Sequence, residues 1–118
     1  MNVEPKFAFV LYYVDDIEAA RRFYVETLGL TVQRQHPTFL QFENFAIASD
    51  EAVGGSREPE AYWIVPDANA AFAELSPRVE IAVPLREMPF GKVFAVKDPT
   101  GNSVYLLEWA QRRPSQAA

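Results

Sequence analysis

The sequence contains no cysteine and only one histidine, His36, and both absences limit the chemistry that is open to it. Disulfides, thiolate metal sites and cysteine nucleophiles are excluded, and no site within one chain can use two imidazoles. No hydrophobic run is long enough to cross a membrane as a helix. The first residues lack the basic start and the small-residue cleavage site of a signal peptide. We therefore expect a cytoplasmic protein with no membrane partner.

Basic residues are in the minority, with 11 Lys and Arg against 16 Asp and Glu, a net charge of −5. Binding to a phosphate backbone depends on clustered Lys and Arg, so no nucleic-acid partner is expected. Arg112 and Arg113 lie in the polar segment QRRPSQAA, which is typical of a frayed C-terminus. What the sequence has in abundance is apolar residues, at 49% of 118, enough for the core of one compact domain.

The first half of the chain predicts a strand, a helix and three short strands. Residues 7–14, FAFVLYYV, form an apolar run of strand length that we expect to be buried on both faces. A helical stripe follows, so a helix is predicted over 16–28, capped by Asp15 or Asp16 and ended by Gly29. The members of the stripe are Ile17, Ala20, Tyr24 and Leu28. Short β-type runs follow at 31–34, 38–42 and 45–49.

The second half repeats this order. Aligning Val14 with Val65 and Asp16 with Asp67 superposes a second strand and a second capped helix on the first. Ser76-Pro77 ends that helix. Further strands are predicted at 79–83, 92–97 and 103–109, the last two joined by a tight Asp-Pro-Thr-Gly-Asn turn.

The predicted fold class is α+β, with two tandem βαβββ modules forming a curved mixed sheet around a central trough. We expect one domain over 1–118. Its parts are module 1 at about 6–49, a linker at 50–59, module 2 at about 60–109 and a tail at 110–118. On the first strand, Phe9, Leu11 and Tyr13 are expected to face the trough, with Val10, Tyr12 and Val14 facing the helix.

Two motifs resemble those of a known family. The frame VDDIEAARRFYVETLGL at 14–30 and the stretch PFGKVFAVKDPTGN at 89–102 resemble the vicinal oxygen chelate superfamily, which includes glyoxalases, bleomycin-resistance proteins and extradiol dioxygenases. The resemblance covers nearly the whole chain. The bleomycin-resistance branch is the most similar, since Met88-Pro89-Phe90-Gly91 resembles its Pro-Trp-Gly stretch, whose aromatic residue borders the ligand groove.

The resemblance implies a set of metal-ligand positions, and this sequence lacks most of the donors. Metal-dependent members use a His, Gln or Glu on the first strand of each module and a carboxylate on the last strand of each. These positions fall on Phe9, on Tyr105 and near Ala46 or Ala48. Only Glu60 matches a ligand slot, and a solvated linker residue is the competing interpretation. We therefore expect no metal and no cofactor.

Aromatic residues stand at two of the positions where metal-dependent members have metal-coordinating side chains. Phenol and phenyl rings bind planar molecules by stacking, and a buried hydroxyl needs a hydrogen-bond partner. Plain core filling is the alternative, and for Phe90 contact with a neighbouring subunit. The predicted ligand-binding residues are Phe9, Leu11, Tyr13, Tyr62, Phe90 and Tyr105. His36 precedes Pro37 with no nucleophile motif nearby, so an exposed loop histidine is expected.

The sequence thus favours a metal-independent protein that sequesters or recognises a small aromatic ligand. The net negative charge adds a weak preference for a cationic one. A homodimer is expected, formed side by side or by module exchange. The alternatives are a glyoxalase-like lyase or isomerase using Glu60 or a tyrosine as acid–base group, and a dimeric accessory protein with a filled trough. Whether the protein is an enzyme is left open at this point.

Overall fold

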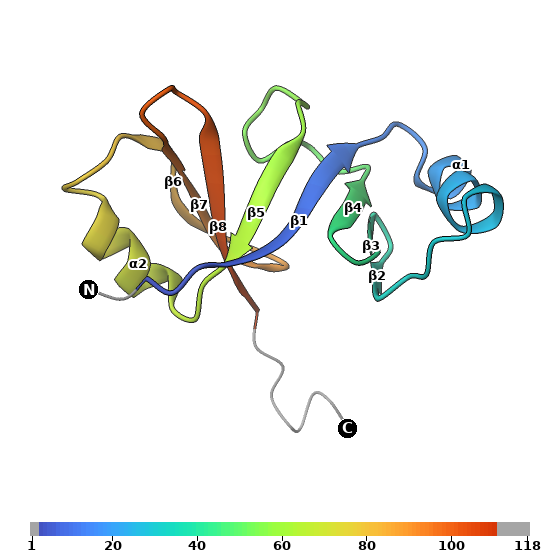
Figure 1. Cartoon of the computed structure of the whole chain (residues 1–118), viewed down its shortest axis with the longest axis horizontal. Coiled ribbons are helices and arrows are strands. Elements are labelled where there is room, and N and C mark those ends of the chain that lie inside the picture. Colours follow the sequence, from blue (N-terminus) through green and yellow to red (C-terminus); the bar gives the residue numbers. More distant parts are fainter. Residues whose placement is uncertain (1–2, 111–118) are drawn as a thin grey trace. The chain divides into compact units, whose positions relative to one another are not determined.

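The computed structural model describes residues 3–110, and Figure 1 shows its helices and strands along the chain. The chain divides into two compact units. One is Phe7–Tyr62, and the other joins the described residues up to Lys6 with those from Trp63 onward. The predicted tail, with Arg112 and Arg113, lies outside the described residues except for Ala110.

The first module has the predicted order of one strand, one helical segment and three strands. Its strands lie in the order β2-β3-β4-β1. Because β1 and β4 run parallel and the other pairs run antiparallel, the sheet is mixed. The elements are β1 Lys6–Tyr13, α1 Ile17–Arg21, η1 Arg22–Thr27, β2 Arg34–His36, β3 Phe39–Gln41 and β4 Phe45–Ala48.

The second module repeats the plan, with strands in the order β5-β8-β7-β6. The side chain of Asp67 accepts a hydrogen bond from the Ala70 N–H and so caps α2, as predicted. The apolar face of α2 packs on the core through Ala68 and Ala71. The elements are β5 Glu60–Ile64, α2 Ala68–Leu75, β6 Ile81–Met88, β7 Gly91–Lys97 and β8 Ser103–Trp109. The α+β class and the two βαβββ modules are confirmed, while the trough stays a prediction.

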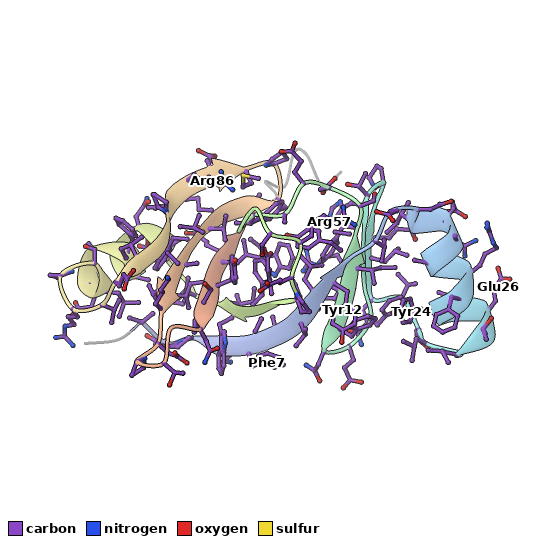
Figure 2. The ribbon with its side chains drawn as sticks, turned by 90° about the horizontal axis from the view of Figure 1, so that it is seen from above. Phe7, Tyr12, Tyr24, Glu26, Arg57 and Arg86 are labelled. Carbon is purple, nitrogen blue, oxygen red and sulfur yellow. The ribbon has the colours of Figure 1, made fainter. Side chains whose placement is uncertain are left out.

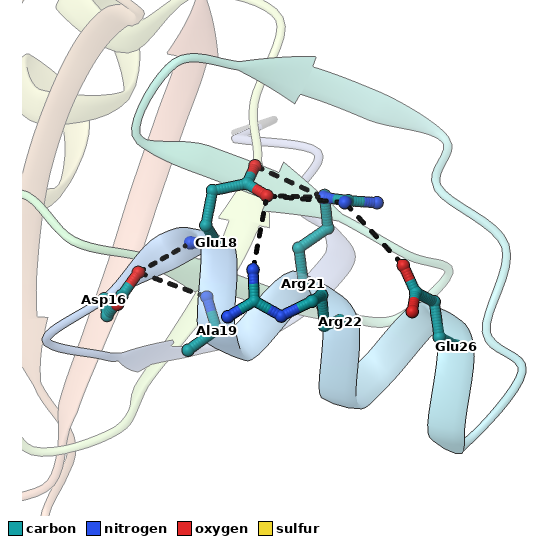
Figure 3. Close-up of polar contacts among 6 residues, drawn as sticks. All are labelled: Asp16, Glu18, Ala19, Arg21, Arg22 and Glu26. Carbon is teal, nitrogen blue, oxygen red and sulfur yellow. Dashed lines mark hydrogen bonds and ion pairs between the residues drawn. The ribbon is translucent and has the colours of Figure 1, made fainter.

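The predicted helix over 16–28 changes type in its middle. Asp16 caps α1 by accepting hydrogen bonds from the N–H groups of Glu18 and Ala19, as Figure 3 shows. From Arg22 the segment is a π-helix, in which the Leu28 N–H bonds the Phe23 carbonyl five residues back. The wider turn rotates later side chains out of phase with the predicted stripe, so Leu28 is 55% exposed. The prediction that Leu28 belongs to the buried stripe was therefore wrong.

The prediction that the first strand is buried on both faces was also wrong. Phe9 and Leu11 are buried, but Tyr12 on the opposite face is 44% exposed. The Tyr12 ring, labelled in Figure 2, packs against Phe45 in a T-shaped arrangement. Of the three residues expected to face the helix, Val14 alone belongs to the described apolar cluster that includes helix residues. One face of β1 therefore lacks a covering layer of helix.

Several strand boundaries differ from the predicted ones, and two of the differences concern Pro84 and His36. Strand β6 continues through Pro84 to Met88, although the prediction ended at Val83. It tolerates proline because it is an edge strand with irregular register around that residue. His36 is exposed, as predicted, but it ends β2 opposite Phe39 instead of lying in a loop. Among the described residues, no helix is long and apolar enough to cross a membrane.

Candidate functional site

Glu60 is the most unusual side chain in the first unit, because its carboxylate is only 3% exposed. It starts β5 on the same face as Tyr62, two residues on. Its Oε1 accepts hydrogen bonds from the hydroxyls of Tyr13 at 2.6 Å and Tyr62 at 2.9 Å. Its Oε2 accepts one from the Gly54 N–H at 2.9 Å. The interpretation of Glu60 as a solvated linker residue was therefore wrong.

The predicted linker, residues 50–59, takes part in this cluster, and we call it the strap. It contains turns but no helix or strand, and it joins β4 to β5 (Figure 1). The Val53 N–H donates to the Tyr13 hydroxyl at 3.1 Å, beside the bond from Gly54 to Glu60. At its outer end, Arg57 pairs with Asp15 at 2.9 Å. The strap is thus held at an inner and an outer point.

Burial and Glu60 keep both phenols protonated. Burial is the main reason that the pKa of Tyr13 lies well above its ordinary value of 10.0, and the hydrogen bond to Glu60 raises it further. For Tyr62, burial again raises the pKa most, followed by the negative charge of Glu60. At neutral pH both hydroxyls are therefore proton donors to the carboxylate, and neither is a base.

A group of stacked rings lies beside this cluster. Phe9 is 2% exposed and stacks on Tyr62, with ring centroids 5.3 Å apart and an interplanar angle of 29°. The Phe9 ring also packs against Phe39 in a tilted arrangement, with ring centroids 5.8 Å apart. Leu11, the next residue on this face of β1, is also buried. Of the six predicted ligand-binding residues, the structure thus places Phe9, Leu11, Tyr13 and Tyr62 in one unit.

The other two predicted ligand-binding residues belong to the second unit. Tyr105 lies in the middle of β8, pairs in register with Ala95 and is 6% exposed. Phe90 is half-buried in the turn between β6 and β7. Neighbouring Gly91 takes φ +149°, and an added Cβ there would come within 3 Å of the β8 backbone. This close approach fixes the turn that carries Phe90.

The donors that are present do not fit a divalent metal ion of the kind the fold family uses. Phe9 and Tyr105 stand at two ligand positions, and Ala46 and Ala48 are buried apolar residues. Among the described residues, the hydrogen bonds to Glu60 come from two phenols and a backbone amide. Across residues 3–110, no group of three or more His, Cys, Asp or Glu side chains is placed to hold a metal.

Sequence reasoning missed part of this site. The run AYWIV at 61–65 predicts this strand without Glu60, and one more residue would have put Glu60 on the face of Tyr62 by simple alternation. Nothing local marks Val53 and Gly54 as donors to a buried cluster, because the partner Tyr13 lies 40 residues from Val53. Phe39 was also overlooked as a neighbour of Phe9.

Comparison with protein families gives one clear match. The Glyoxalase/Bleomycin resistance protein/Dioxygenase superfamily matches residues 6–106. No curated protein matches the chain.

Solved structures share the fold at low identity. A Legionella pneumophila structure described as an NAD-dependent benzaldehyde dehydrogenase is 21% identical, with a TM-score of 0.71 over 86% of this chain and 98% of that one. Methylmalonyl-CoA epimerase from Mycobacterium tuberculosis is 19% identical, with a TM-score of 0.63 over 90% and 89%. A superfamily member from Vibrio splendidus 12B01 is 17% identical, with a TM-score of 0.61 over 88% and 98%. At these identities the likeness establishes the fold alone.

Proposed function

The chain belongs to the Glyoxalase/Bleomycin resistance protein/Dioxygenase superfamily, that is, the vicinal oxygen chelate superfamily, and from that premise we propose that it binds a small aromatic molecule without a metal ion. The observation that carries this proposal is the replacement of metal donors by stacked rings. Phe9, at the first ligand position, stacks on Tyr62 with the two rings tilted by 29°. Rings of this kind favour flat ligands, because aromatic rings stack in offset geometry and exclude water.

The state of Glu60 supports binding over catalysis. A general base needs a lone pair that can reach a substrate proton. Both oxygens of Glu60 already accept hydrogen bonds, and the phenols of Tyr13 and Tyr62 are held protonated. While the strap is closed, Glu60 is thus engaged as an acceptor on both oxygens, which favours binding over the glyoxalase-like alternative.

The proposal also includes the oligomeric state and the cellular location of the protein. We propose a homodimer, because two-fold dimers are the commonest form among symmetric homo-oligomers. Sedimentation at micromolar concentration tests it, and a mass of about one chain, 13.3 kDa, would contradict it. A cytoplasmic location stays a prediction of the sequence.

A thermal-shift panel tests the binding function. Purified protein is heated with planar aromatic compounds, some cationic and some neutral. Because a ligand that binds only the folded state stabilises it, at least one is expected to raise the melting temperature. Phe9→Leu removes the ring that stacks on Tyr62, so it is expected to lose part of the ligand-induced shift, measured against its own baseline melting temperature. A panel without any shift would contradict the proposal and would favour the accessory protein with a filled trough.

A further inference from the structure

Glu60 is a buried carboxylate, and none of the ion pairs among the described residues includes it. Within residues 3–110 it accepts hydrogen bonds from two hydroxyls and one amide. This is the pattern of an ionised carboxylate, which only accepts hydrogen bonds. Most buried carboxylates are stabilised by a positively charged neighbour, whereas these hydrogen bonds to Glu60 come from neutral donors.

The strap supplies donors that a ligand could also supply. The Gly54 N–H meets Glu60 Oε2, and the Val53 N–H meets the Tyr13 hydroxyl. Because the hydrogens of both phenols point to Glu60, the oxygens of the cluster present acceptors toward the strap. Two N–H groups on a short segment therefore occupy two neighbouring acceptors.

The outer attachment of the strap is weak. Arg57 and Asp15 form an exposed ion pair, with side chains 48% and 97% exposed, and such pairs contribute little. Arg57 also has φ +60°, in the left-handed region that favours glycine. The ion pair thus holds a residue in an unfavourable backbone conformation, and its loss favours release of the strap.

We propose that the strap covers a site for an organic cation with N–H donors, an ammonium or amidinium group attached to an aromatic ring, and that Glu60 is the residue that recognises it. The proposal rests on the function proposed above and names its ligand class. When the strap moves away, a cationic N–H group takes the place of the Gly54 amide on Glu60. A second N–H takes the place of Val53 on the Tyr13 hydroxyl.

The neighbouring rings suit the rest of such a ligand. Tyr62, which donates to Glu60, is the ring on which Phe9 stacks. An aromatic amidinium can therefore place its charge at Glu60 and its ring against this pair. A neutral amide of the same shape has a carbonyl oxygen that would face the carboxylate, so it binds more weakly. Since the closed strap blocks the site, the apparent affinity falls with the fraction of open molecules.

Benzamidine and its neutral isostere benzamide test the proposal by calorimetric titration of the full chain. Wild-type protein is expected to bind benzamidine and to bind benzamide much more weakly. Arg57→Ala, which loosens the strap, is expected to bind benzamidine roughly two- to five-fold more tightly. Arg78→Ala is the matched control, because it removes the same charge and an exposed ion pair with Glu74 in the other unit. It is expected to bind as the wild type does.

Glu60→Gln keeps the shape and removes the charge, so it is expected to weaken benzamidine binding at least about ten-fold. Benzamidine binding that survives Glu60→Gln, or equal gains in Arg57→Ala and Arg78→Ala, would overturn this inference and leave the proposed function standing. If neither probe nor any other aromatic compound binds the wild type, the inference and the proposed function both fail. The arginine variants alter exposed side chains, so the comparison stands even if Glu60→Gln does not fold.

Discussion

The hydroxyl of Tyr13 lies 2.6 Å from Oε1 of Glu60, although 47 positions separate the two residues in the sequence. This bond joins β1 to the start of β5, and the Val53 N–H of the strap donates a second hydrogen bond to the same Tyr13 hydroxyl. A short contact between a phenol and a carboxylate is among the stronger hydrogen bonds in proteins. The first unit is therefore organised around a polar cluster as well as an apolar core.

Removing the acceptor is expected to destabilise the fold. Glu60→Ala leaves the hydroxyls of Tyr13 and Tyr62 and the Gly54 N–H without their partner, at a cost of about 3 kcal/mol. Glu60→Gln retains an acceptor oxygen and is expected to cost about 1 kcal/mol. Urea unfolding measures both, with Glu58→Ala as the exposed control. A Glu60→Ala variant as stable as the control would show that the cluster contributes nothing to stability.

The strap depends on the Tyr13 hydroxyl. Tyr13→Phe removes the acceptor of the Val53 N–H and one donor to Glu60, so the free energy of unfolding should fall by about 1–2 kcal/mol. Tyr12→Phe, at an exposed neighbour, should change it little. Hydrogen exchange at Val53 separates a local effect from a global one. Unchanged protection of that amide in Tyr13→Phe would contradict the bond.

Substitutions of Tyr105 on β8 test whether a carboxylate, the residue type that metal-dependent family members have on this strand, can be accommodated there. Tyr105 is buried on β8, so Tyr105→Glu places a carboxylate where the described structure has no cluster of metal donors. The expected cost is several kcal/mol, from an uncompensated buried charge. Tyr105→Phe, measured in parallel, retains the ring and is expected to stay close to wild type. If added divalent metal restored the stability of Tyr105→Glu, the donors would fit a metal after all.

Alkaline pH should weaken the fold through the buried phenols. The pKa of Tyr62 in the folded protein is raised by burial and by Glu60 above the ordinary value of 10.0. The contribution of the protonated Tyr62 phenol to the free energy of unfolding is therefore fully present below pH 10.0. It is lost as the pH rises further, because the phenol releases its proton at a lower pH in the unfolded chain than in the folded protein. The free energy of unfolding should then fall by up to about 1.4 kcal/mol per pH unit for this phenol. Denaturant titrations of wild type and Tyr62→Phe from about pH 8 to 11.5 measure it. An equally steep decline in both proteins would contradict the assignment.

Local signals predicted much of the fold. Asp16 and Asp67 begin helices by accepting N–H bonds, and Gly29 ends the first helical segment with φ +80°. The final strand has the predicted bounds, and the turn before it is held by Asp98, which accepts the N–H groups of three following residues. Each of these features depends on residues close in sequence, so a sequence pattern suffices to predict it.

The candidate site was less predictable because its decisive contacts are long-range. The charge and linker context of Glu60 indicate exposure, and only its tertiary contact with Tyr13 accounts for its burial. The π-helix was also not predicted. An α-helix and a π-helix can have the same amino-acid composition, so the sequence pattern of this segment does not distinguish them. The aromatic residues at Phe9 and Tyr105, by contrast, could be read directly from the sequence, and with them the missing metal donors.

The central claim is that this protein binds an aromatic ligand without a metal ion. The most direct measurement is a calorimetric titration with the strongest ligand of the thermal-shift panel, using protein freed of metal by a chelator, with the metal content measured on the same sample. The account predicts the same dissociation constant before and after chelation and no stoichiometric divalent ion. Loss of binding on chelation, restored by one equivalent of a divalent metal, would contradict it.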